Sequence, residues 1–113
     1  IFKPLPNDEC AGALDIQANN ETVYGTTMYT IPSIYDTFGL YDVWYSFIGS
    51  GINTTASLCG EETTFDTYIE IFEADGDSCD QAMSIAENDD FDFCGRASEV
   101  NWFAEMGVNY YIR

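Results

Sequence analysis

The chain has 113 residues, 46% of them hydrophobic and 16% aromatic, and twenty Asp and Glu against three Lys and Arg give a net charge of -17. This length suits one domain with a modest core, and the apolar content excludes a disordered tail. The charge excludes nucleic acid as a partner, because that binding depends on Lys and Arg at phosphates. It leaves divalent cations, cationic partners or a solvated acidic surface. No stretch approaches the ~20 consecutive apolar residues of a membrane helix, so we expect no membrane insertion.

The chain begins with a proline-containing segment, residues 1–9, which predicts a linker ahead of a single domain over residues 10–113. Residues 10–16 allow either one helical turn or a first strand, and residues 29–41 predict a loop. Strand signals, meaning β-branched and aromatic residues or strict alternation, recur at 22–27, 42–47, 53–58, 67–72, 83–86, 100–104 and 109–112. The turn at 105–107 predicts a hairpin between the last two of these strands.

Short strands at this spacing, without a convincing long helix, predict an all-β fold. We expect a jelly-roll-like antiparallel β-sandwich of about seven to nine strands. Alternation within the strands assigns the core to Val43, Tyr45, Phe47, Ile69, Ile71, Val100, Trp102, Tyr110 and Ile112. Trp44 and Phe103 have the opposite parity. If their face is not covered, these two rings are the candidates for stacking on a ligand.

The cysteine count is even, and the four residues are Cys10, Cys59, Cys79 and Cys94. Two disulfides and an oxidising compartment follow from this count, whereas zinc is disfavoured because the chain has neither a CxxC pair nor a histidine. Cys79 and Cys94 flank one short strand, so a local bridge between them is expected, which leaves Cys10 for Cys59. N-glycosylation sequons begin at Asn20 and Asn53. Together these features predict a protein that is secreted or displayed at the cell surface.

Six segments, in this order, carry a resemblance to a known family: PNDEC (6–10), DVWYSF (42–47), FDTYIEIF (65–72), NDD (88–90), SEV (98–100) and GVNYYI (107–112). They resemble the bacterial pre-peptidase C-terminal domain family and its relatives in large secreted and surface proteins. The resemblance spans nearly the whole chain. It implies a non-catalytic jelly-roll sandwich of the kind appended to secreted proteases, collagenases and adhesins, some of which bind calcium, collagen or polysaccharide.

Calcium is the cofactor that the acidic residues favour, because this cation takes six to eight oxygen ligands. The resemblance implies Asn7, Asp8 and Asp42 as ligands, since these positions match those near the metal in the calcium-binding relatives. Composition alone offers a second cluster at Asp89, Asp90 and Asp92, with Asp66 as a further candidate. The alternative is that these carboxylates only cap turns.

Catalysis is not expected, because a chain without histidine excludes Ser-His-Asp and Cys-His arrangements. The sequence predicts a non-catalytic extracellular module, with calcium as its candidate stabilising ion, that binds a polysaccharide or a matrix protein, as an adhesion domain does. The alternative is a structural building block of an extracellular filament or cell-surface assembly, whose partners are copies of itself.

Overall fold

A computed structural model describes residues 6–17, 22–25, 42–60, 63, 66–74, 76, 78–79, 81–89, 94–95 and 97–113. Within these residues the chain forms one short 3-10 helix, η1 (Cys10–Gly12), and seven strands. The strands are β1 (Leu14–Asp15), β2 (Tyr45–Ile48), β3 (Ile52–Ser57), β4 (Ile69–Ala74), β5 (Met83–Asn88), β6 (Glu99–Ala104) and β7 (Asn109–Ile112). No helix among the described residues is long and apolar enough to cross a membrane.

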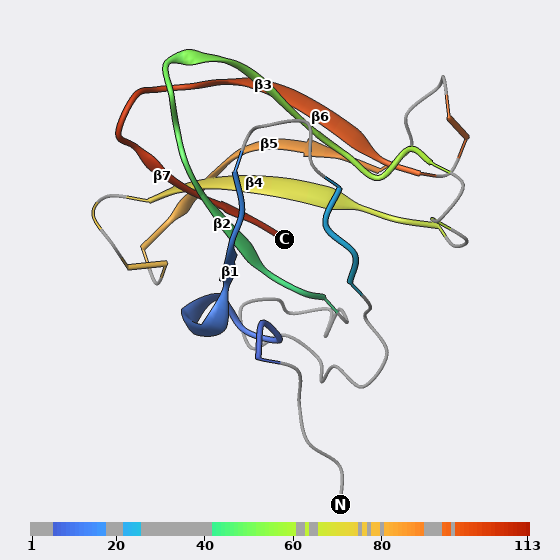
Figure 1. Cartoon of the computed structure of the whole chain (residues 1–113), viewed down its shortest axis with the longest axis horizontal. Coiled ribbons are helices and arrows are strands. Elements are labelled where there is room, and N and C mark those ends of the chain that lie inside the picture. The colour runs from blue at the N-terminus through green and yellow to red at the C-terminus, as the bar shows by residue number, and fades with distance from the viewer. Residues whose placement is uncertain are drawn as a thin grey trace, which may run out of the picture.

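The strands form a five-stranded sheet in the order β1-β2-β7-β4-β5 and a two-stranded sheet of β3 and β6 (Figure 1). All neighbouring pairs are antiparallel except β1 and β2, which are parallel. The chain changes sheet between β2 and β3, between β3 and β4, between β5 and β6, and between β6 and β7. The predicted all-β sandwich is therefore confirmed.

The main core lies between the two sheets, where alternating side chains of both layers meet. Its buried members are Phe47, Ile69, Ile71, Val100, Trp102, Ala104, Tyr110 and Ile112. Trp102 makes edge-on contacts with Phe47 and Tyr110, at ring-centroid distances of 6.1 Å and 5.8 Å. Such aromatic pairs contribute roughly 0.5–1.5 kcal/mol each beyond the area they bury. Of the predicted core, Tyr45 packs on this cluster while only partly buried, and Val43 is half-buried.

A second cluster covers the other face of the five-stranded sheet, with Cys10, Trp44, Ala74 and Tyr111 at its centre. Trp44 is only 3% exposed, so the prediction of Trp44 as an exposed stacking residue is wrong. The N-terminal segment explains the burial. The backbone N–H of Trp44 donates to the carbonyl of Asn7 at 2.8 Å, and the Asn7 side-chain amide donates to the carbonyl of Trp44 at 3.2 Å. Part of the predicted linker thus packs on the sandwich.

The disulfides are Cys10–Cys79 and Cys59–Cys94. Two bridges were expected, but the predicted pairing is wrong. At ~3.4 Å per residue β5 separates its own two ends by about 17 Å, and each cysteine instead bridges to another part of the fold, Cys79 to η1 and Cys94 to the end of β3. The register of β3 with β6 places Ser57 opposite Glu99. Cys59 therefore follows β3 at the same end of the small sheet at which Cys94 precedes β6.

The predicted hairpin of the last two strands is also wrong, because β6 pairs with β3 whereas β7 pairs with β2 and β4. The turn between them exists, with Gly107 at φ +79°, but it links the two layers. It packs against the β2–β3 connection: Gly107 N–H donates to the Gly49 carbonyl, and Gly49 N–H donates to the Val108 carbonyl, both at 2.9 Å. A Cβ at Gly49 would lie 2.1 Å from the Glu105 carbonyl oxygen, so this close approach needs glycine.

In the first part of the chain the prediction can be compared only at the described residues. Residues 22–25, part of the predicted strand 22–27, form no strand. Residues 10–16 contain both of the alternatives, since η1 is followed by β1. The predicted loop at 29–41 lies outside the described residues.

Candidate functional site

Phe103 is the predicted stacking residue that the structure leaves open, with 57% of its surface exposed. It lies on β6 between Trp102 and Ala104, which both face the core. Strand alternation therefore directs Phe103 to the outer face of the two-stranded sheet. The cross-strand register pairs it with Asn53 and pairs the next outward residue, Asn101, with Thr55.

These four residues, Asn53, Thr55, Asn101 and Phe103, are called the Phe103 face below. All four are exposed, and the Asn101 amide donates a hydrogen bond to the Thr55 hydroxyl at 2.7 Å. The Asn53 side chain makes no hydrogen bond within the part of the chain that the structure describes. The face thus offers one aromatic ring beside amide and hydroxyl groups, the combination that can stack on a sugar ring and hydrogen-bond its hydroxyls.

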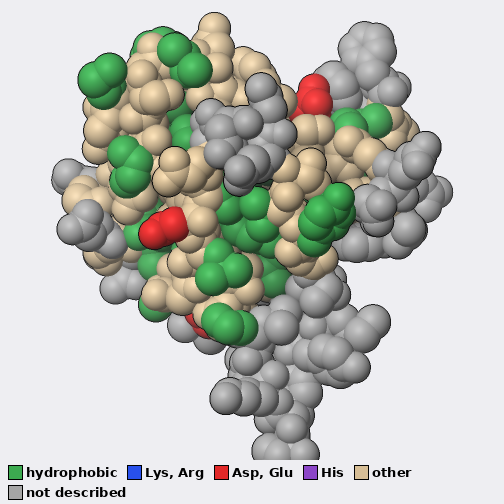
Figure 2. Space-filling model, viewed as in Figure 1, with side chains coloured by type: hydrophobic (Ala, Val, Ile, Leu, Met, Phe, Trp, Pro, Cys, Tyr) green, Lys and Arg blue, Asp and Glu red, His purple; other side chains and the backbone are tan. Residues whose placement is uncertain are grey.

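Other hydrophobic side chains also reach the surface. On the face that Figure 2 shows, some of them stand apart near the edge and others gather towards the middle. A groove of about 590 Å³ runs along β1 and β2, lined by apolar residues such as Ala13, Ile16 and Phe47 together with Asp15 and Ser46. The Ser46 hydroxyl donates to the Asp15 carboxylate. This groove is the second surface to be weighed as a binding site.

The structure brings together the segments that carry the first predicted metal cluster. Asn7, Asp8 and Asp42 are all buried, and Asn7 is hydrogen-bonded to Trp44, two residues beyond Asp42. Burial raises the pKa of Tyr45, and a side-chain hydrogen bond with Asn7 partly offsets this rise. The Asp42 carboxylate faces Arg113, with its Oδ2 3.4 Å from the Arg113 Nε. Calcium at this cluster remains a prediction.

The second predicted cluster is described only in part. Asp89 is exposed, and its backbone carbonyl accepts a hydrogen bond from the Ser98 hydroxyl. Ser98 is buried and also bonds to Thr67, so this part of the turn joins β5 to the start of β6. Asp90 and Asp92 lie outside the described residues. Among the residues that are described, no group of three or more His, Cys, Asp or Glu side chains is placed to hold a metal.

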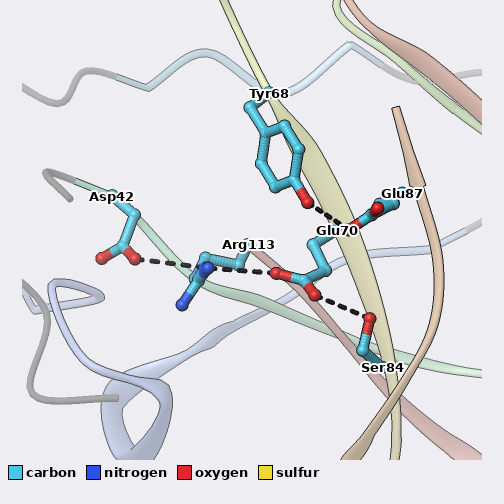
Figure 3. Close-up of polar contacts among 6 residues, drawn as sticks. All are labelled: Asp42, Tyr68, Glu70, Ser84, Glu87 and Arg113. Carbon is cyan, nitrogen blue, oxygen red and sulfur yellow. Dashed lines mark hydrogen bonds and ion pairs between the residues drawn. The ribbon is translucent and has the colours of Figure 1, made fainter. Parts of the chain in front are cut away.

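Arg113 is a residue whose role was not predicted. Its guanidinium lies between Asp42 and Glu70, 3.0 Å from the Glu70 Oε1 (Figure 3). It also lies 5.6 Å from the ring centroids of both Trp44 and Phe72. Backbone hydrogen bonds in both directions with Glu70, at 2.9 Å and 3.0 Å, hold it in register. A signal was present in the sequence: in a chain with only three Lys and Arg, each cation is a candidate partner for buried carboxylates.

The polar contacts continue from Arg113 along the outer face of the five-stranded sheet (Figure 3). The Ser84 hydroxyl donates to the Glu70 Oε2 at 2.6 Å, and the Tyr68 hydroxyl donates to the Glu87 carboxylate. Burial raises the pKa of Tyr68, and the hydrogen bond to Glu87 and the charges of Glu70 and Glu87 raise it further. Ser84 and Arg113 thus pair with both oxygens of the Glu70 carboxylate, and Tyr68 pairs with one of Glu87, so these contacts link neighbouring strands and stabilise the sheet.

Of the two predicted glycosylation sites, one lies among the described residues. Asn53 lies on β3 and is exposed, whereas Asn20 lies outside the described residues. Both remain predictions.

The fold and site together define a class: a disulfide-braced all-β sandwich with one exposed face that combines an aromatic ring with amide and hydroxyl groups. Comparison with protein-family models, with curated proteins and with solved structures found no match for this chain.

Proposed function

We propose that this chain is a non-catalytic binding module of an extracellular protein and that it holds a neutral polysaccharide on the Phe103 face. The observation that carries the proposal is the 57% exposure of Phe103 beside the hydrogen-bonded Asn101 and Thr55. An exposed aromatic ring loses hydration cheaply when a sugar ring covers it, and nearby amides can bond the sugar hydroxyls.

The charge supports a neutral rather than an anionic ligand. A net charge of -17 repels polyanions over distances of about a Debye length, roughly 8 Å at physiological salt. The Phe103 face itself consists of two amides, one hydroxyl and one phenyl ring. On the same side of the small sheet the register continues to Ser57 and Glu99, so the adjoining surface adds one carboxylate rather than the pair that glycoside cleavage requires.

An extracellular setting and stabilisation by calcium are part of the same proposal. Two disulfides favour an oxidising compartment. Asn7, Asp8 and Asp42 are the proposed calcium-binding residues. A bound divalent ion would offset repulsion among carboxylates at the N-terminal side of the sandwich.

The experiment is a binding screen of the full chain against insoluble cellulose, chitin and β-1,3-glucan, with Phe103→Ala and Met83→Ala as matched variants. Met83 is 71% exposed on β5, in the other sheet, so its substitution removes a comparable exposed apolar group elsewhere. We expect Phe103→Ala to weaken binding to one of these polymers about tenfold, the effect of losing roughly 1.4 kcal/mol of contact, while Met83→Ala binds normally. Equal binding by both variants contradicts the proposal.

One observation favours the second function, a building block of an extracellular assembly. Within the described residues β3 pairs only with β6, and Ile52 at its start is 56% exposed. A strand edge of this kind is a template for pairing with another chain. Light scattering at rising protein concentration separates the two functions, since discrete monomers support the binding module and polymers support the building block.

A further inference from the structure

Asn53 and Phe103 are direct cross-strand neighbours on the outer face of the small sheet. Side chains at such paired positions have Cβ atoms about 4.5–5.5 Å apart. Asn53 also opens the sequon Asn53-Thr54-Thr55. The structure therefore places an exposed aromatic ring beside the amide to which a glycan would be attached.

We propose that Asn53 carries an N-linked glycan and that its first N-acetylglucosamine packs on the Phe103 ring. In the attachment step the Asn53 Nδ2 forms a bond to the anomeric carbon of a lipid-pyrophosphate-linked oligosaccharide. The bond from that carbon to the pyrophosphate oxygen breaks, the lipid pyrophosphate leaves, and the amide loses one proton to a base of the transferase. The donor is the usual co-substrate of secretory glycosylation at this tripeptide.

Packing follows from the position of the first sugar. An N-acetylglucosamine on Nδ2 starts one amide length from the β3 backbone, and the phenyl ring of Phe103 stands opposite on β6. The C–H bonds of the sugar can face the negative surface of the ring. Asn101 and Thr55, which are hydrogen-bonded to each other, lie two residues further along the same face and are within reach of the acetamido group.

The packing also regulates the proposed binding site, and this consequence rests on the proposed function. A sugar attached at Asn53 and an external polysaccharide compete for the same ring. The glycosylated form therefore binds neutral polysaccharide more weakly than the unglycosylated form.

The test uses the full chain, secreted from a eukaryotic host with Asn20→Gln so that Asn53 is the remaining sequon, and trimmed enzymatically to one N-acetylglucosamine. Intact mass shows whether the sugar is present. Melting temperatures are then compared between the sugar-bearing chain and its sugar-free form, which carries Asn53→Gln. This comparison is made in four backgrounds: the parent chain, Phe103→Ala, Phe103→Tyr and Ile85→Ala. Ile85 is exposed on β5 and serves as the matched control.

We expect the sugar to raise the Tm by roughly 3–6 °C in the parent chain, the shift that an aromatic contact gives in a domain of this size. The gain should persist in Phe103→Tyr and Ile85→Ala and vanish in Phe103→Ala. An unmodified mass at Asn53, or an equal gain in Phe103→Ala, overturns the inference. Polysaccharide binding is measured in parallel on the Asn20→Gln chain made in the periplasm of a bacterial host that does not glycosylate, so that Asn53 itself is kept and carries no sugar. If the Tm result holds and no polymer binds, the proposed function fails while the packing of the glycan stands.

Discussion

Replacement of Arg113 by methionine tests the charge network on the outer face of the five-stranded sheet. The side chains of Arg113, Asp42 and Glu70 are only 8%, 10% and 13% exposed. At 3.4 Å and 3.0 Å, and with an effective dielectric constant of about 20, each ion pair has a Coulomb energy of roughly 5 kcal/mol before the cost of desolvation. Methionine keeps the apolar contact with Trp44 and Phe72 but leaves two largely buried carboxylates without this cation.

We expect Arg113→Met to lower the free energy of unfolding by about 3 kcal/mol, the lower end of the cost of breaking a buried pair. The Tm should fall on the order of 15 °C, measured by thermal circular dichroism. Gln17→Glu, at an exposed position, gives the same net charge and should change stability by less than about 0.5 kcal/mol. Adding Asp42→Asn and Glu70→Gln to Arg113→Met should restore most of the loss. If Arg113→Met is as stable as Gln17→Glu, the network does not hold the sheet.

Three further predictions concern the bridges, the tyrosine and the metal. Peptide mapping without reduction should recover Cys10–Cys79 and Cys59–Cys94, and recovery of Cys79 joined to Cys94 would refute this topology. Removing either bridge should lower the free energy of unfolding by about 4 kcal/mol, since each bridge closes a long loop. Because the folded-state pKa of Tyr68 is raised, the folded chain holds that proton more tightly, so stability should fall as pH rises past the unfolded pKa of about 10. Urea titrations from roughly pH 9 to pH 11 cover the range around that pKa. Tyr68→Phe should lose less stability over this range than the parent chain, and an equal loss in both would refute this role of Tyr68. Millimolar calcium should raise the Tm of the parent chain but not of Asp8→Asn, with sodium chloride at equal ionic strength as the control; a shift fully reproduced by sodium excludes a site.

Strand alternation predicted the parts of this fold that depend on local pattern. β4 and β7 bury Ile69, Ile71, Tyr110 and Ile112 as expected. The reason is that a shift of one residue in register would move all the apolar side chains of a strand to the solvent face. Phe103 was assigned to the outer face by the same argument. Trp44 has that parity too, but its face is covered by Asn7, Cys10 and Ala13, a long-range contact that leaves no local signal.

Pairing in space could not be predicted from neighbours in sequence. A tight turn at Glu105 and Gly107 is compatible with a hairpin or with a change of layer, and only the partner strands β3, β2 and β4 decide between them. The disulfides show the same limit, because Cys79 and Cys94 are near each other in sequence but bridge to Cys10 and Cys59. Asp42 precedes β2, Glu70 lies on β4 and Arg113 follows β7. Their ion pairs therefore also depend on how the strands are arranged in space.

The most direct test of the proposed binding site is an NMR titration of the unglycosylated chain, uniformly labelled with ¹⁵N, with a neutral oligosaccharide cut from the polymer that binds in the screen. We expect the largest amide shift changes at Asn53, Thr55, Asn101 and Phe103, and we expect Phe103→Ala to remove them. Shift changes centred instead on Ile16, Ser46 and Phe47 in the groove along β1 and β2 would contradict it, because the ligand would then bind where the Phe103 face plays no part.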